Sequence, residues 1–171
     1  MDQILQSCIR GYMEGVDRTN RKYKTQEVFT PDWMVKFCLN EIAEYQDAGS
    51  ICLDQAAGDG QFLSQVLINK TKSKHSKGMS IHDSFVTSLD EIFGVDIEAD
   101  NVKLCRERLL CGCTDADVID LVHSRIIIGD CLNPYESIPG QTELDRSLMI
   151  KYFGSKTGAF LHDLRAIAQG K

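Results

Sequence analysis

Three short apolar runs, each closed by an aspartate, constrain the fold of this 171-residue chain more than any other feature. Apolar runs of four to six residues without polar alternation are typical of strands that are buried on both faces of a parallel sheet. The runs and their final acids are residues 50–54 with Asp54, residues 92–96 with Asp96, and residues 125–130 with Asp130.

Helical patterns separate the three runs. Residues 61–68 and 101–110 have the apolar spacing of helices, and shorter helices are expected at 81–90 and 115–122. This alternation predicts an α/β fold, an open parallel sheet with helices on both faces. Because the carboxyl ends of parallel strands meet at one edge, where ligands bind, we expect the three aspartates to border one site.

Helical segments also flank this core. Residues 2–16 carry apolar side chains at three- and four-residue spacing, and a second helix is expected to begin at Pro31 with Thr30 as its cap. Residues 142–153 and 157–169 show the same periodicity. The predicted organisation is one domain over 1–171, with a helical N-terminal segment at 1–48, a core at 49–132 and a helical tail at 133–171.

Charge and hydropathy narrow the range of partners. The chain has 19 Lys and Arg against 25 Asp and Glu, a net charge of -6, so contact with nucleic acid must come from local basic patches. Two such patches lie at 18–24 and 70–77, the second within a stretch, 69–80, that is expected to be a solvated loop. No signal peptide and no run of about 20 apolar residues is found, which predicts a soluble cytoplasmic protein without a membrane partner.

The seven cysteines are scattered and lie mostly in apolar runs, which is typical of buried reduced residues. Cys111 and Cys113 form the only close pair. Since no second pair or histidine pair stands at zinc spacing, no metal site is predicted.

A glycine loop, Ala57-Gly58-Asp59-Gly60, follows the first run. It lacks the lysine of a Walker motif and the three glycines of a dinucleotide fingerprint, which argues against a kinase, an ATPase or an ordinary dehydrogenase. Acids before the loop and at the ends of the next two runs favour a ligand with hydroxyl and amine donors. The structural alternative is that the same acids only cap neighbouring helices.

Four pieces of the chain together resemble S-adenosylmethionine-dependent DNA adenine-N6 methyltransferases of restriction-modification systems. Their order and spacing over residues 26–132 carry the resemblance more than any single piece does. They are Phe29-Thr30-Pro31, the run from Leu53 to Leu63 around the glycine loop, Phe93-Gly94-Val95-Asp96-Ile97, and Gly129-Asp130.

The resemblance implies a Rossmann-like methyltransferase domain that binds S-adenosylmethionine. Thr30 and the backbone around Phe29 would approach the methionine carboxylate of the cofactor. Asp54 would hold the methionine amine together with the loop, Asp96 the ribose hydroxyls and Asp130 the adenine amine. The full cofactor-binding set expected from the resemblance is Phe29, Thr30, Pro31, Asp54, Ala56, Gly58, Gly60, Phe62, Asp96, Ile97 and Asp130.

The catalytic motif of that family, Asn/Asp-Pro-Pro-Tyr/Phe, has no clear counterpart in this chain. Asn133-Pro134-Tyr135 has similar residue types, but it begins three residues after Asp130, and Asn before Pro is a common turn signature. Gln55 and Ala57 also replace the family's Pro and Cys in the loop, where the backbone does most of the binding. No catalytic residue is therefore assigned.

By resemblance, the sequence predicts the cofactor-binding domain of a DNA adenine-N6 methyltransferase. DNA is the expected substrate. The chain is expected either to act with a partner chain that carries the catalytic motif or the target-recognition region, or to be reduced from a longer enzyme. A catalytically inactive methyltransferase-like protein, with a binding or regulatory role in restriction or anti-restriction systems, is the alternative from a different class.

Overall fold

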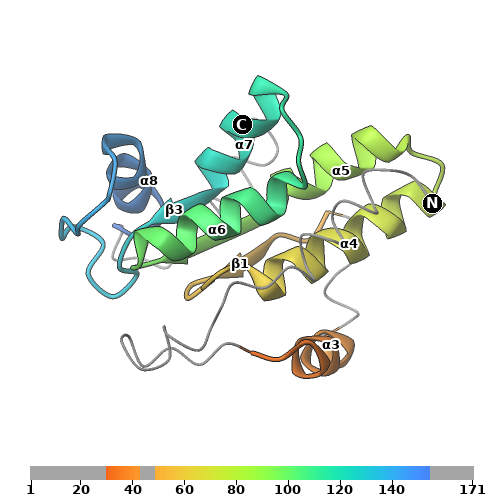
Figure 1. The fold of residues 1–171 in the computed structure, drawn as a ribbon, viewed down its shortest axis with the longest axis horizontal. Coiled ribbons are helices and arrows are strands. Elements are labelled where there is room, and N and C mark those ends of the chain that lie inside the picture. The colour runs from red at the N-terminus through yellow and green to blue at the C-terminus, as the bar shows by residue number, and fades with distance from the viewer. Residues whose placement is uncertain (1–29, 43–48, 155–171) are drawn as a thin grey trace.

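The computed structural model describes residues 30–42 and 49–154. Its centre is an open sheet of three parallel strands in the order β1-β2-β3, which confirms the predicted α/β architecture (Figure 1). The register places Leu53 opposite Phe93 and Asp96 opposite Ile128. The strands are β1 (Cys52–Asp54), β2 (Ile92–Asp96) and β3 (Ile126–Ile128).

Six helices are described around this sheet. In Figure 1, α3 lies beside α4 at one side of the molecule, and α8 lies at the end of the sheet near β3. The helices are α3 (Asp32–Glu41), α4 (Gln61–Ser76), α5 (Ile81–Asp90), α6 (Ala99–Leu110), α7 (Ala116–Arg125) and α8 (Glu143–Phe153). The predicted helices at 2–16 and 157–169, the basic patch at 18–24 and Phe29 lie outside the described residues.

Alternate residues of the strands face two separate cores. Ile92, Ile126 and Ile128 pack into the larger core, which α3, α4, α5, α6 and α7 complete. Phe93 and Ile127 point to the opposite face, where α8 covers them. Helices therefore lie on both faces, as predicted.

Gly94 in β2 allows α4 to approach the sheet closely. A Cβ atom at this position would lie 2.6 Å from Cδ1 of Leu63 and 3.0 Å from Cδ1 of Ile126. The missing side chain thus fixes how near the helix after the glycine loop can pack.

One buried carboxylate ties α8 to the rest of the fold. Asp145 accepts hydrogen bonds from Nη2 of Arg106 at 2.7 Å and from the backbone N–H of Ile128 at 3.2 Å. Its second oxygen accepts from the N–H and hydroxyl of Thr142, which form a capping box at the start of α8. The start of α8 is thereby fixed to both β3 and α6.

The predicted solvated loop at 69–80 is wrong, because α4 continues to Ser76. The Lys70 side chain is 1% exposed and its Nζ lies 2.9 Å from Oε2 of Glu91, while Nζ of Lys74 lies 2.7 Å from Oε1. A lysine can lie on the inner face of a helix when its aliphatic stem packs and its ammonium group meets a carboxylate. Of the four lysines in the 70–77 patch, only Lys72 and Lys77 are exposed.

No helix within residues 30–42 and 49–154 is long and apolar enough to cross a lipid bilayer.

We expect Glu91→Gln to lower the free energy of unfolding by about 3 kcal/mol, the lower end of the range for breaking a buried ion pair, because the Glu91 side chain retains some exposure. The change leaves two buried ammonium groups without a counter-charge. Urea denaturation monitored by circular dichroism measures the effect. Glu107→Gln, on the exposed side of α6, is the control and should change stability by less than about 0.5 kcal/mol. Equal effects of the two changes would mean that the lysine cluster does not support the fold.

Candidate functional site

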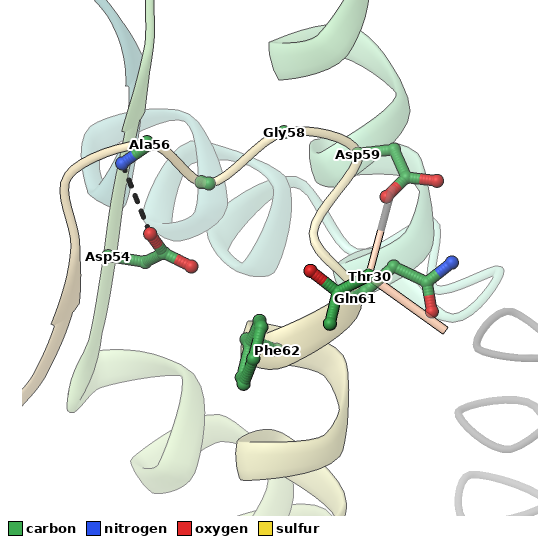
Figure 2. Close-up of a pocket in the computed structure, with 8 residues that line it drawn as sticks. Thr30, Asp54, Ala56, Gly58, Asp59, Gln61 and Phe62 are labelled. Atoms are coloured by element: carbon green, nitrogen blue, oxygen red, sulfur yellow. Dashed lines mark hydrogen bonds between the residues drawn. The ribbon is translucent and has the colours of Figure 1, made fainter. Parts of the chain in front are cut away.

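A cavity of about 350 Å³ lies at the carboxyl end of β1. It is formed by the end of the strand, the glycine loop, the first residues of α4 and Thr30, which precedes α3 (Figure 2). Its lining residues are Thr30, Asp54, Ala56, Ala57, Gly58, Asp59, Gln61 and Phe62.

The three aspartates share one local structure, although Asp130 lies two residues after the end of β3 and does not end the strand as predicted. Each carboxylate accepts a hydrogen bond from the backbone N–H two residues further on, a turn that Asp forms readily. The bonds are Asp54 to Ala56 at 3.1 Å, Asp96 to Glu98 at 2.9 Å and Asp130 to Leu132 at 2.8 Å. The alternative that these acids only cap neighbouring helices is wrong for Asp54 and Asp96, since neither α4 nor α6 has a side-chain cap. The acids form turns between strand and loop instead.

The remaining carboxylate oxygens have different partners. Oδ2 of Asp96 accepts from the N–H of Gly58 at 2.8 Å, and Oδ2 of Asp130 accepts from Nδ2 of Asn133 at 2.9 Å. Oδ2 of Asp54 has no hydrogen-bond partner among the described residues and belongs to a side chain that lines the cavity. Asp54 is thus the carboxylate best placed to accept from a ligand.

The acids also influence one another's charge. Burial raises the pKa of Asp54 above its usual range; the Ala56 N–H partly offsets this, and the negative charge of Asp96 adds to the rise. The Asn133 side chain donates to Asp130 and lowers the pKa of that carboxyl. Burial and the three nearby acids raise the pKa of Cys131 to about 12, so this thiol stays protonated at neutral pH.

The two glycines of the loop have different roles. Gly58 has φ +54° with open space where a side chain would begin, whereas Gly60 has φ +84° and a Cβ there would lie 2.6 Å from Sγ of Cys105. Both conformations favour glycine. Gly60 therefore permits close packing of the loop on α6, while Gly58 supplies the left-handed backbone conformation of the loop where it lines the cavity.

The structure brings together five of the predicted cofactor residues. Those that line the cavity are Thr30, Asp54, Ala56, Gly58 and Phe62. Thr30 does not cap α3, since Pro31 is the N-cap residue and no side-chain cap bond forms. The other predicted residues within the described ranges do not line it: exposed Pro31, buried Gly60, and Asp96, Ile97 and Asp130 at the same sheet edge.

Three further residues line the cavity and are not in the cofactor-binding set expected from the resemblance. They are Ala57, Asp59 and Gln61. Leu132 is 89% exposed beside Asp130, as Ile97 is 53% exposed beside Asp96, so apolar side chains accompany the acids at this edge. The only sequence signal for Leu132 is its position two residues after a strand-ending acid.

The turn predicted at Asn133-Pro134-Tyr135 is confirmed. The N–H of Asn133 donates to the carbonyl of Asp130, and the N–H of Glu136 donates to the carbonyl of Asn133. The Tyr135 hydroxyl donates to the carbonyl of Gly154 at the end of α8.

Comparison of the chain with protein-family models, with curated proteins and with solved structures gave no match.

Asp54→Asn should raise the thermal stability of the ligand-free protein at neutral pH. A carboxyl whose pKa is raised by folding is destabilising when ionised, and the amide keeps an acceptor for the Ala56 N–H. The wild type should gain stability as pH falls through the raised pKa of Asp54, a gain that the variant lacks. Asp130→Asn is the opposite control: the pKa of Asp130 is lowered, so this change should reduce stability. Differential scanning calorimetry over a pH series measures both, and a loss of stability in Asp54→Asn would contradict the electrostatic description.

Proposed function

We propose that this chain binds S-adenosylmethionine as the cofactor-binding domain of a DNA adenine-N6 methyltransferase. The observation that carries the proposal is that Thr30 lines the same cavity as Asp54 and Phe62. These residues belong to two separate pieces of the family resemblance, and no local constraint on the chain requires the pieces to meet.

The residues around the cavity fit the charged end of this cofactor. The volume of about 350 Å³ falls within the range of small-molecule sites. The second oxygen of Asp54 would accept from the methionine ammonium group, and the Thr30 hydroxyl would donate to the carboxylate. A cavity whose main ionisable group is a partly buried carboxylate also favours a cationic sulfur.

The other two acids fit the nucleoside end. A carboxylate offers about four acceptor positions, and three described donors use those of Asp96: the N–H groups of Gly58 and Glu98, and Nδ2 of Asn101. One position remains for a ribose hydroxyl. Asp130 has two described donors, and the exposed side chains of Ile97 and Leu132 would contact the faces of the adenine ring.

The proposed chemistry is direct transfer without a covalent enzyme intermediate. When bound, the cofactor supplies a methyl group on a positively charged sulfur, which adenine N6 would attack in line. The residues of this chain would bind and orient the donor. The protonated thiol of Cys131, beside the three acids, is not suited to act as a nucleophile.

A second candidate is a methyltransferase-like protein that binds the cofactor and transfers nothing. It is favoured by the turn at 133–135, whose Asn133 and Tyr135 side chains contact Asp130 and Gly154, and by the lack of a strand after β3 in the described ranges. The two candidates differ in one requirement. The methyltransferase proposal needs a partner chain that supplies the base-binding motif, whereas the second candidate needs none. DNA would reach either protein through local basic patches, of which the described part of the chain retains Lys72 and Lys77.

Isothermal calorimetry with S-adenosylmethionine tests the cofactor proposal. Wild-type protein should bind, and Asp54→Asn should weaken binding by about 1.5–3 kcal/mol, the usual contribution of a hydrogen bond to a charged group. Since the same change is expected to stabilise the free protein, unfolding would not explain the loss. Glu107→Gln should bind like wild type. An affinity unchanged in Asp54→Asn would remove this residue from the site, and no binding by wild type would refute the proposed function.

A tritium-methyl transfer assay on unmodified DNA separates the two candidates. The isolated chain should bind the cofactor but transfer little or nothing. Extruding an adenine from the duplex costs a few kcal/mol, and only the binding free energy of a base pocket can compensate this cost. Transfer restored by a partner chain would favour the methyltransferase proposal. Robust transfer by the isolated chain that Asn133→Ala or Tyr135→Ala abolishes would contradict this prediction and assign the base pocket to the turn.

A further inference from the structure

One face of α6 holds the whole glycine loop in place. Asn101, Cys105 and Arg108 stand at i, i+4 and i+7 and are all buried, which puts them in a single stripe along the helix. Nδ2 of Asn101 lies 3.3 Å from Oδ1 of Asp96, whose other oxygen accepts from Gly58, and Cys105 packs against Gly60. Arg108, the third member, contacts Asp59.

Arg108 forms two hydrogen bonds with Asp59. Its Nη2 lies 2.9 Å from Oδ2 of Asp59, and its Nε lies 2.9 Å from the backbone carbonyl oxygen of the same residue. The two side chains are 4% and 2% exposed. A guanidinium group that binds a side chain and a backbone atom at once fixes the path of the loop as well as the charge of the acid.

This ion pair also determines the charge around the cavity. Asp59 lines the cavity beside Asp54 and, without a counter-charge, would add a second carboxylate to it. Because Arg108 neutralises Asp59, Asp54 is the lining carboxylate without a described cationic partner. Removing only one member of the pair would leave a buried charge next to the ligand.

We infer that Arg108 is a positioning residue which, by holding and neutralising Asp59, leaves Asp54 as the carboxylate that sets the preference of the cavity for a cationic ligand. The inference rests on the proposed function, because it concerns the charged sulfur of S-adenosylmethionine. S-adenosylhomocysteine carries the same nucleoside and amino-acid groups with a neutral sulfur. The ratio of the two dissociation constants therefore reports the local charge and is insensitive to a general loosening of the site.

The test measures both ligands by calorimetry with wild type, Asp59→Asn and the double variant Asp59→Asn/Arg108→Met. In Asp59→Asn the Arg108 charge is left unbalanced, so preference for S-adenosylmethionine over S-adenosylhomocysteine should fall about tenfold, equivalent to about 1.4 kcal/mol. The double variant removes both charges and should return the ratio to within about threefold of wild type. Arg108→Lys keeps the charge but cannot reproduce the two-point contact, so it should weaken both ligands while leaving the ratio unchanged.

A wild-type ratio in folded Asp59→Asn would overturn the inference and leave the proposed function standing. If Asp59→Asn does not fold, the double variant and Arg108→Lys decide. A tenfold change of the ratio in either variant, or wild-type affinity for both ligands in Arg108→Lys, would overturn the inference. Weaker binding of both ligands by Arg108→Lys at a wild-type ratio would support it. Wild-type protein that binds neither ligand would overturn both the inference and the function on which it rests.

Discussion

The parallel pairing of three neighbouring strands is the constraint on which the rest of this structure depends. Because β1, β2 and β3 run in one direction, their final residues reach the same edge of the sheet. After each strand the chain must turn there into a loop. Asp54 and Asp96, the last residues of β1 and β2, and Asp130, two residues after β3, make that turn by accepting from the backbone two residues later. The hydrogen bonds that end the strands thus bring three carboxylates together.

Three negative charges close together repel one another, and the three carboxylates differ in how many donors compensate their charge. Asp130 has a side-chain donor in Asn133, and Asp96 has the backbone of Gly58. Asp54 has only its turn bond, and burial raises its pKa, so its charge is the least compensated of the three. A carboxylate that destabilises its own fold is typical of a functional position, because a ligand can supply the compensation that the protein does not.

The sequence predicted the sheet well, since its signals were local and unambiguous. The apolar run of β2 and the helical period of α5 have the bounds expected from the pattern, and β1 and β3 are shorter because their outer residues leave the ladder. The lysines of α4 were misread because periodicity treats every Lys as a solvent residue, whereas Lys70 meets Glu91 across 21 positions of the chain. An ion pair between residues so far apart in the sequence cannot be detected from the pattern of neighbouring residues.

The sequence indicated the main residues of the candidate site but not the contacts that support them. Strand-ending acids and a glycine loop are visible in a single sequence, and so is Thr30 once a resemblance is considered. The role of Arg108 was not visible, because a basic residue near the end of a helix is ordinarily an exposed one. Only the packing of α6 on the loop shows that this side chain points inward to Asp59.

The attachment of α8 through Asp145 has a consequence for the order in which the molecule assembles. The carboxylate needs Arg106 of α6 and the N–H of Ile128 in place before it loses its hydration, so α8 has no stable docking surface until β3 has joined the sheet. The second core, in which α8 covers Phe93 and Ile127, therefore depends on the pairing of β3 with β2 as well as on the apolar contacts of α8 itself.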